Sequence, residues 1–549
     1  MSLLLDIYGL LSVVVHGLLL TAQSLTLGGV AFIVLVAQPL AGDLGDTGMR
    51  IVARCRRLTQ WSAGAVILVV AINVATEALV LADTLDISLV ESVTAAFALA
   101  GLAQMAAAAI IALLCRPAAR AGGAGLVLAG LALLAAGTAT SHAVAQIDNR
   151  ALLSAATALH RLCAGSWIGG IPCFLIALAG SSGQGAWRRI GKRFSLLSLV
   201  SVTAIVAIGF VMSVFYIGSL EALYGTAYGI MVIAKTLLFL GLLGLGGMNF
   251  LVVERLRAGR DAPILRLRRF AEVEVGVGIT VLFIAASITS LPPAIYLTND
   301  RVTLAEYAQR LTPRWPSFST PVQASLAIAE LQAKLDGEAA QGAPAVSAYV
   351  PGAGLPPPRN AANIAWSEYN HHWAGVFVLI MALLALSERN GSARWARHWP
   401  LLFVPFAGFL AYRDLAEGGL EDNIGFLTLL RDPEITQHLF FYALMAAFGV
   451  FEWSVRTRRL QAPRAALVFP LLTATAAGAL LTHSHSLANV KDLLLIEVTH
   501  VPLALLGITF AWARWLELRL VPAEGVIAGW VWRSSFVLVG LLLVLYREI

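Results

Sequence analysis

The run from Ser195 to Ile217, SLLSLVSVTAIVAIGFVMSVFYI, contains 23 residues and no charged side chain. As an α-helix it would reach about 34 Å, which is enough to cross the ~30 Å hydrocarbon core of a bilayer. Lipid offers no hydrogen-bond partners to backbone N–H and C=O groups, so a spanning run of this kind forms a helix. The run therefore predicts a transmembrane helix.

Similar apolar runs recur along the whole chain of 549 residues. The composition agrees, because 58% of the residues are hydrophobic and only 13% are charged, against about 25% charged in soluble domains. The alternating pattern of an outer-membrane barrel is absent. We therefore expect an all-α, polytopic integral membrane protein in a lipid bilayer, and soluble enzyme classes are excluded. The net charge of +6 is interpreted as a topology signal, so no nucleic-acid partner is expected.

The apolar runs predict about 14 transmembrane helices. Their expected ranges are 8–38, 61–81, 93–114, 123–143, 155–179, 195–217, 228–252, 274–295, 371–387, 399–412, 437–454, 465–483, 493–513 and 528–546.

Basic residues fall mainly in alternate loops, such as the loop with Arg54, Arg56 and Arg57 and the loop with Arg188, Arg189 and Lys192. The positive-inside rule makes the Arg-rich side cytoplasmic. An even number of spans then places both termini in the periplasm. The start of the chain, Met1 to Asp6, has no basic residue, so we expect no cleaved signal peptide.

Three regions are expected. Residues 1–295 form an eight-helix membrane domain, 296–370 an external Pro/Ala-rich loop, and 371–549 a six-helix, His-rich membrane domain. The first domain resembles a duplication of 1–150 as 151–295, since His16 with Gly28-Gly29 recurs as His160 with Gly169-Gly170. A four-helix unit repeats in parallel orientation, as in some transporters.

Most of the ten histidines fall near the periplasmic ends of the expected spans. In the six-helix domain several are spaced three or four residues from a carboxylate, which puts both groups on one helix face. His483 and His485 are two residues apart and would converge only if the helix frays. The candidate metal ligands are His371, His372, His438, His483, His485, His500, Glu434 and Glu497.

Imidazole suits copper, zinc, iron and nickel, and a nearby carboxylate either ligates the ion or orients the ring. Two facing imidazoles would equally hold haem b. A structure without a bound cofactor is the third alternative. The four cysteines, Cys55, Cys115, Cys163 and Cys173, lie in or beside apolar segments and are interpreted as packing residues.

A pathway through the eight-helix domain is the second candidate site. Lys235 is an ionisable residue deep in an expected span, which is costly in lipid and indicates function. The structural alternative pairs it with Glu77 or Glu221. The candidate pathway residues are His16, His142, His160 and Lys235.

Several stretches resemble the copper resistance protein D family (CopD) in its long form with a C-terminal six-helix extension. In the first domain they are Thr140–Ala143, His160–Gly170, Arg193–Ser195, Tyr228–Lys235 and Thr289–Pro293. In the last domain they are Asp432–Glu434 with Gln437-His438, and Thr482–His485 with Thr499-His500. The resemblance implies a bacterial inner-membrane protein that handles copper and is described as importing it from the periplasm to the cytoplasm.

The primary expectation is therefore copper import, with capture by outward-facing histidines. A membrane copper- or haem-binding protein or oxidoreductase without net transport is the alternative, as is an assembly factor that delivers copper to a periplasmic or respiratory partner. A periplasmic copper-binding protein is the protein partner that we expect. A transporter or metal-binding protein is favoured over an enzyme. No GxxxxGK[ST] stretch is visible, which argues against ATP-driven pumping.

Overall fold

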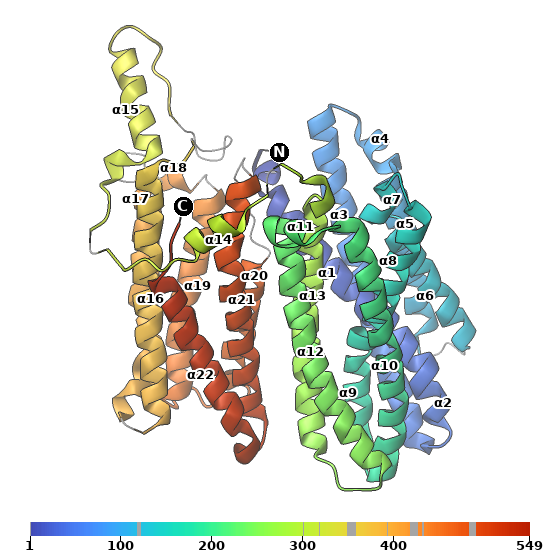
Figure 1. The fold of residues 1–549 in the computed structure, drawn as a ribbon. Coiled ribbons are helices and arrows are strands. Elements are labelled where there is room, and N and C mark those ends of the chain that lie inside the picture. Colours follow the sequence, from blue (N-terminus) through green and yellow to red (C-terminus); the bar gives the residue numbers. More distant parts are fainter. Residues whose placement is uncertain are drawn as a thin grey trace. The chain divides into compact units, whose positions relative to one another are not determined.

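The computed structural model describes residues 2–117, 122–299, 301–317, 319–348, 358–391, 393–417, 426–430, 433–481 and 490–548. Within these ranges every regular element is a helix (Figure 1). The expected all-α fold of a polytopic membrane protein is confirmed.

Eleven helices in the described ranges are long and apolar enough to cross a membrane. The three other expected spans coincide with shorter helices, namely α6 (Gly123–Thr138), α17 (Phe403–Glu417) and α20 (Val468–Leu480). Every expected span therefore has a helix, although these three are at most 16 residues long.

The chain forms two compact units. The N-terminal unit comprises Leu10–Tyr224 and Met231–Thr298, and the C-terminal unit comprises Met1–Gly9, Gly225–Ile230 and Asn299–Ile549. Each unit is described by itself below.

The N-terminal unit is a bundle of long helices joined by short segments. Its elements are α1 (Ser2–Phe32), η1 (Ile33–Ala37), α2 (Gln38–Ala41), α3 (Gly45–Leu85), α4 (Leu89–Thr94), α5 (Ala96–Leu114), α6, α7 (His142–Ala145), α8 (Arg150–Ala164), η2 (Gly165–Gly169), α9 (Ile171–Gly180), α10 (Gln184–Tyr216), α11 (Leu220–Gly225), α12 (Ala227–Arg257), α13 (Ile264–Ser290) and η3 (Ala294–Tyr296). Both η1 and η2 are π-helical, a local form that is frequent at functional sites.

Two glycine pairs let helices of the N-terminal unit cross closely. A Cβ atom on Gly28 would collide with the backbone of Gly165, Gly169 and Gly170, and one on Gly169 would collide with the carbonyl of Ser24. The glycine pairs Gly28-Gly29 and Gly169-Gly170, which the proposed duplication relates to each other, therefore lie in contact. The equivalence of the two halves stays a prediction.

The C-terminal unit begins with the segment expected to be an external loop, which contains short helices. Its elements are α14 (Leu304–Arg310), η4 (Gln323–Ser325), α15 (Ala327–Ala339), α16 (Ala361–Arg389), η5 (Arg394–Leu402), α17, α18 (Phe426–Leu429), α19 (Pro433–Arg456), η7 (Ala465–Leu467), α20, α21 (Val490–Arg519) and α22 (Pro522–Val544). Its core is aromatic, with Trp399, Phe469, Phe510, Trp532 and Phe536 in one cluster.

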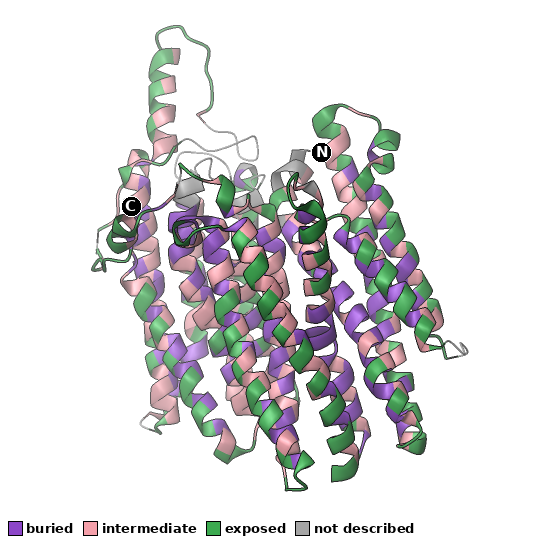
Figure 2. Ribbon diagram, turned by 45° about the vertical axis from the view of Figure 1, so that its right-hand side comes forward, coloured by how far each residue is buried: buried purple, intermediate pink, exposed green. Residues whose placement is uncertain are grey.

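Many residues along the spanning helices are exposed (Figure 2), and large apolar side chains are among them. On α10, Leu196, Val200 and Phe210 are all more than half exposed. In a soluble protein such exposure would be an aggregation hazard, whereas in a bilayer these side chains contact lipid. The pattern fits the membrane assignment.

Candidate functional site

Two of the expected metal ligands meet in the C-terminal unit. The rings of His371 on α16 and His500 on α21 have centroids 6.2 Å apart and planes at 87°. Each Nδ1 lies 2.9 Å from a backbone carbonyl of its own helix, that of Ser367 for His371 and that of Ile496 for His500. Because a carbonyl only accepts, each Nδ1 carries the proton and each Nε2 is left as the basic nitrogen. This is the arrangement that metal-binding histidines commonly adopt.

Tyr546, which follows α22, forms a wall of this pair. Its ring stacks on His371 with centroids 4.0 Å apart and planes 14° apart. Arg310 of α14 donates from Nη2 to the Tyr546 hydroxyl at 2.8 Å, and His372 donates from Nε2 to the Tyr546 carbonyl at 2.6 Å. Burial and the nearby charge of Glu548 raise the pKa of Tyr546 to about 12. The phenol therefore stays neutral and positions His371 rather than acting as an anionic ligand.

Two carboxylates near the pair, Glu368 and Glu548, are neutralised by arginines. Glu368 lies 2.7 Å from Arg314 and accepts from the backbone N–H of Glu548 at 2.9 Å. Glu548 lies 2.5 Å from Arg359. Burial would raise the pKa of Glu548, but the charge of Arg359 and its hydrogen bond hold that pKa below the ordinary value. These acids anchor the end of the chain.

The other expected ligands divide into three groups. His438 on α19 is 2.8 Å from Asp414 of α17. Glu497 is buried, and its Oε2 has no hydrogen-bond partner among the described residues. His483 and His485 lie outside the described residues, as does the side chain of Glu434. In the described part of the chain, no three His, Cys, Asp or Glu side chains are arranged to hold one metal ion.

A cavity of about 380 Å³ lies at the start of α16, and neither His371 nor His500 is among its lining residues. Its charged and titratable lining residues are Arg314, Glu368, Tyr369 and His372. The buried Nδ1 of His372 has no hydrogen-bond partner in the described structure, and it is the basic nitrogen of this ring because Nε2 donates to Tyr546.

The four expected pathway residues belong to one region of the N-terminal unit. His142 lies near enough to interact electrostatically with His16, Lys235 with His160, and Arg161 with both His16 and His160. His142 contacts the carbonyl of Thr289 through Nε2. His16 Nε2 and His160 Nδ1 are buried without a hydrogen-bond partner among the described residues.

Arg161 is the functional candidate that the sequence reasoning missed. It lies inside the expected span 155–179, next to His160, and donates to the carbonyl of Gly137 at 2.7 Å. A second cation within an apolar run was the signal that could have identified it. The suggested partner of Lys235, Glu77, accepts instead from Asn73 at 3.0 Å.

Comparisons with known proteins agree with the sequence resemblance. Residues 188–288 match the family described as copper resistance protein D. The chain is 33% identical over 164 residues to the copper transport protein CutJ of Bacillus subtilis, which covers 29% of this chain and 29% of that protein. The chain thus matches less than a third of the length of this relative. No solved structure matches the chain.

Proposed function

Because the chain carries a copper resistance protein D segment, we propose that it imports copper across a bacterial plasma membrane, from the periplasm to the cytoplasm. The family match and the relative support a role in copper handling or transport. Two further claims belong to our proposal alone, namely that copper moves into the cytoplasm and that histidines capture it. Both chain termini would then lie in the periplasm.

The observation that carries the proposal is the spacing of His371 and His500. A first-row metal ion lies about 2.0 Å from an imidazole nitrogen, and the ring centre lies roughly 1 Å further away. Two rings on opposite sides of one ion are therefore roughly 6 Å apart, and the observed separation is 6.2 Å. Neutral imidazole suits copper in either oxidation state.

The pair lies at the end of α16 that the positive-inside rule makes periplasmic. His371 is 18 residues, or about 27 Å of helix, before Arg389, the last residue of α16. Arg389 is followed by the basic loop with Arg394 and Arg397. Capture would therefore take place on the outer side, where a periplasmic copper-binding protein is the donor that we propose.

Passage is assigned to the N-terminal unit. His16, His142 and His160 supply imidazoles, while Arg161 and Lys235 add positive charge. The two cations oppose tight binding of a copper ion. Conduction requires a site that binds strongly enough for the ion to enter and weakly enough for it to leave, so this mixture favours transit over storage.

Copper binding by the detergent-purified protein tests capture. We expect one equivalent of copper to be lost in the double variant His371→Ala/His500→Ala, which should remain folded although it loses the stack of His371 on Tyr546. The matched control is His398→Ala, because His398 accepts from the indole N–H of Trp453 at 2.8 Å in the Arg-rich region. An unchanged copper stoichiometry in the double variant would overturn the assignment.

The same spectra separate copper from haem b, since two axial imidazoles on iron require a similar ring separation. A Soret band that disappears in the double variant would replace copper capture with haem binding. Uptake of copper into proteoliposomes then tests transport. Accumulation by wild type but not by the double variant supports import, whereas equal accumulation by both excludes a role for this pair.

A further inference from the structure

Three of the four cysteines gather in the N-terminal unit, although they lie far apart in the sequence. Cys55 is on α3, Cys173 is on α9, and Cys115 follows α5 directly. Cys55 donates from Sγ to the backbone carbonyl of Cys173 at 3.8 Å, and Cys115 is near enough to act electrostatically on Cys173. All three are at most 2% exposed. Packing alone does not require three thiols from three helices to converge.

The cluster lies at the Arg-rich end of the bundle. Cys55 stands between Arg54 and Arg56, Cys115 precedes Arg116, and α9 ends at Gly180, before Arg188. By the positive-inside rule this end is cytoplasmic. The guanidinium of Arg56 acts electrostatically on Cys115, so one positive charge lies beside the sulfur atoms.

A series of hydroxyl groups leads from the middle of α1 to Cys55. Thr26 on α1 donates to the hydroxyl of Ser62 on α3 at 3.0 Å. Ser62 donates to the carbonyl of Thr59 at 3.0 Å, and Thr59 donates to the carbonyl of Cys55 at 2.9 Å. His16 lies ten residues before Thr26 on the same helix α1. These hydroxyl groups therefore extend from Thr26 to the backbone carbonyl of Cys55, and His16 lies about 15 Å of helix before Thr26.

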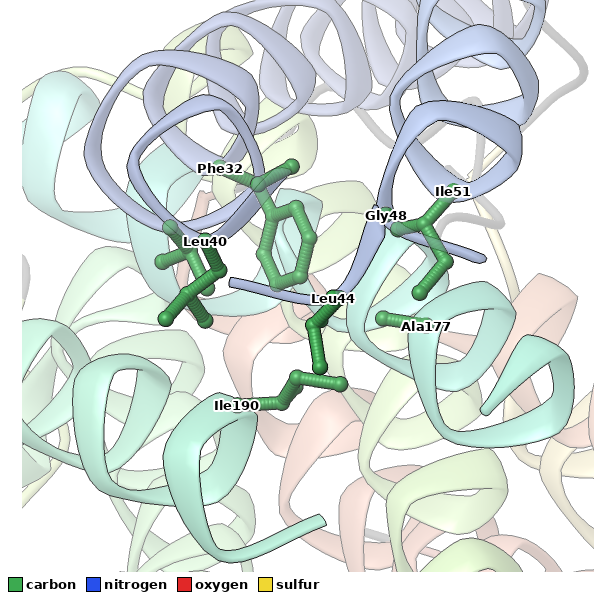
Figure 3. A pocket seen from close by; sticks show the side chains of 9 residues that line it. Phe32, Leu40, Leu44, Gly48, Ile51, Ala177 and Ile190 are labelled. Atoms are coloured by element: carbon green, nitrogen blue, oxygen red, sulfur yellow. The ribbon is translucent and has the colours of Figure 1, made fainter. Parts of the chain in front are cut away.

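A small cavity lies one helical turn beyond the thiols toward the Arg-rich end. Its volume is about 10 Å³, and its lining includes Ile51, four residues before Cys55, and Ala177, four residues after Cys173. Figure 3 shows Phe32 and Leu40 on one side of this space, with Ile51 and Ala177 on the other. The space is about as large as one water-sized sphere, which is also the scale of a single dehydrated ion.

We propose that Cys55 and Cys173 form a two-coordinate Cu(I) site, with Cys115 as a third sulfur to which the ion exchanges before release to the cytoplasm. This inference rests on the proposed copper import, and it identifies the copper site at the cytoplasmic end of the import pathway. Thiolate sulfur is the soft ligand that selects Cu(I), and two thiolates suffice for linear coordination. This ligand set is distinct from the imidazoles that we assign to capture.

The protons and charges of this step balance without a redox reaction. Each Cu–S bond replaces one S–H bond, so binding one Cu(I) releases two protons to water. The resulting bis-thiolate complex carries one negative charge, which Arg56 near Cys115 compensates. Passing the ion to Cys115 breaks one Cu–S bond and forms another, with one proton moving in the opposite direction.

The test titrates Cu(I) into the reduced, full-length protein under anaerobic conditions, in competition with a chromophoric Cu(I) chelator. X-ray absorption at the copper edge identifies sulfur and nitrogen ligands. We expect wild type to bind one sulfur-ligated and one nitrogen-ligated Cu(I). The double variant Cys55→Ser/Cys173→Ser loses only the sulfur-ligated ion, and Cys163→Ser, a buried cysteine outside the cluster, loses neither.

The outcomes separate this inference from the proposed function. Loss of the nitrogen-ligated ion in His371→Ala/His500→Ala, without any copper–sulfur signal in wild type, overturns the thiol site and leaves capture intact. A copper–sulfur signal that survives unchanged in Cys55→Ser/Cys173→Ser also overturns it. Since the wild-type spectrum alone decides whether sulfur binds copper, the test does not depend on the folding of the cysteine variant.

Discussion

The imidazole of His371 stacks on the phenol ring of Tyr546, with ring centroids 4.0 Å apart. This contact joins α16 to the residues that follow α22, and Arg310 fixes the phenol from a third element. A ligand whose ring is held by packing keeps its geometry when the metal ion is absent. Tyr546 should therefore matter to copper binding without touching copper.

Substitution of Tyr546 tests this positioning role. Tyr546→Phe keeps the stacked ring but removes the hydroxyl that Arg310 bonds, and we expect it to cost about 1–2 kcal/mol of unfolding free energy. Tyr546→Ala removes the ring as well, which should cost about 3–5 kcal/mol and weaken copper binding at least tenfold. Chelator competition and thermal unfolding measure both effects. Equal copper affinity in Tyr546→Ala and wild type would show that the stack does not position His371.

Glu517 joins three arginines at the Arg-rich end of the C-terminal unit. It lies 3.0 Å from Arg389 and 2.9 Å from Arg533, and it also pairs with Arg514. Glu517→Gln would leave these cations close together in a partly buried site, which should cost about 3–5 kcal/mol. The control is Glu254→Gln, because Glu254 forms an exposed pair with Arg257 and should cost under about 1 kcal/mol. Similar melting temperatures for the two variants would contradict the prediction.

Because the helices cross closely at Gly28 and Gly169, adding one methyl group there should lower the unfolding free energy strongly. A Cβ on Gly169 would overlap the Ser24 carbonyl, and backbone gives way less readily than a flexible side chain. We expect Gly169→Ala to lower the unfolding free energy by about 3 kcal/mol. Gly209→Ala on α10 meets no atom within 4 Å and should be neutral or stabilising by about 0.5–1 kcal/mol. Comparable losses in both variants would exclude the close crossing as the cause.

Hydropathy was sufficient to predict the helices. The bilayer thickness sets their length, and each apolar run can be recognised without knowing the rest of the structure. It could not predict which helices are neighbours. His371, His500 and Tyr546 come from three distant segments, and only the bundle brings their rings together. Glu368 precedes His371 by three residues, a spacing that puts both side chains on one helix face, yet Arg314 neutralises this acid. A rule based on residue spacing within one helix cannot predict an arginine that comes from another segment of the chain.

The cysteines illustrate the same limit. None of Cys55, Cys115 and Cys173 belongs to a CxxC pair, so each is interpreted from the sequence as a buried packing residue. Their convergence depends on how α3, α5 and α9 pack. Arg161 differs from the cysteines, because a cation inside an apolar run can be recognised from the sequence alone.

The pair of Glu548 and Arg359 predicts a pH dependence. Although burial opposes ionisation, Arg359 holds the pKa of Glu548 below its ordinary value of 4.5. A lowered folded-state pKa contributes stability that is present above about 4.5 and is lost as the pH falls through the folded value. Acidification below about pH 4.5 should therefore release the residues after α22, and with them the Tyr546 ring that supports His371.

Thermal unfolding of wild type and Glu548→Gln between pH 7 and pH 3.5 measures this contribution. At pH 7 we expect the variant to be less stable, because Arg359 loses its charged partner. As the pH falls, the difference should shrink, since protonation removes the same charge from wild type. Loss of copper with a parallel pH dependence in wild type would connect the ion pair to the imidazole pair. A stability difference that stays constant down to pH 3.5 would show that Glu548 does not ionise with a lowered pKa.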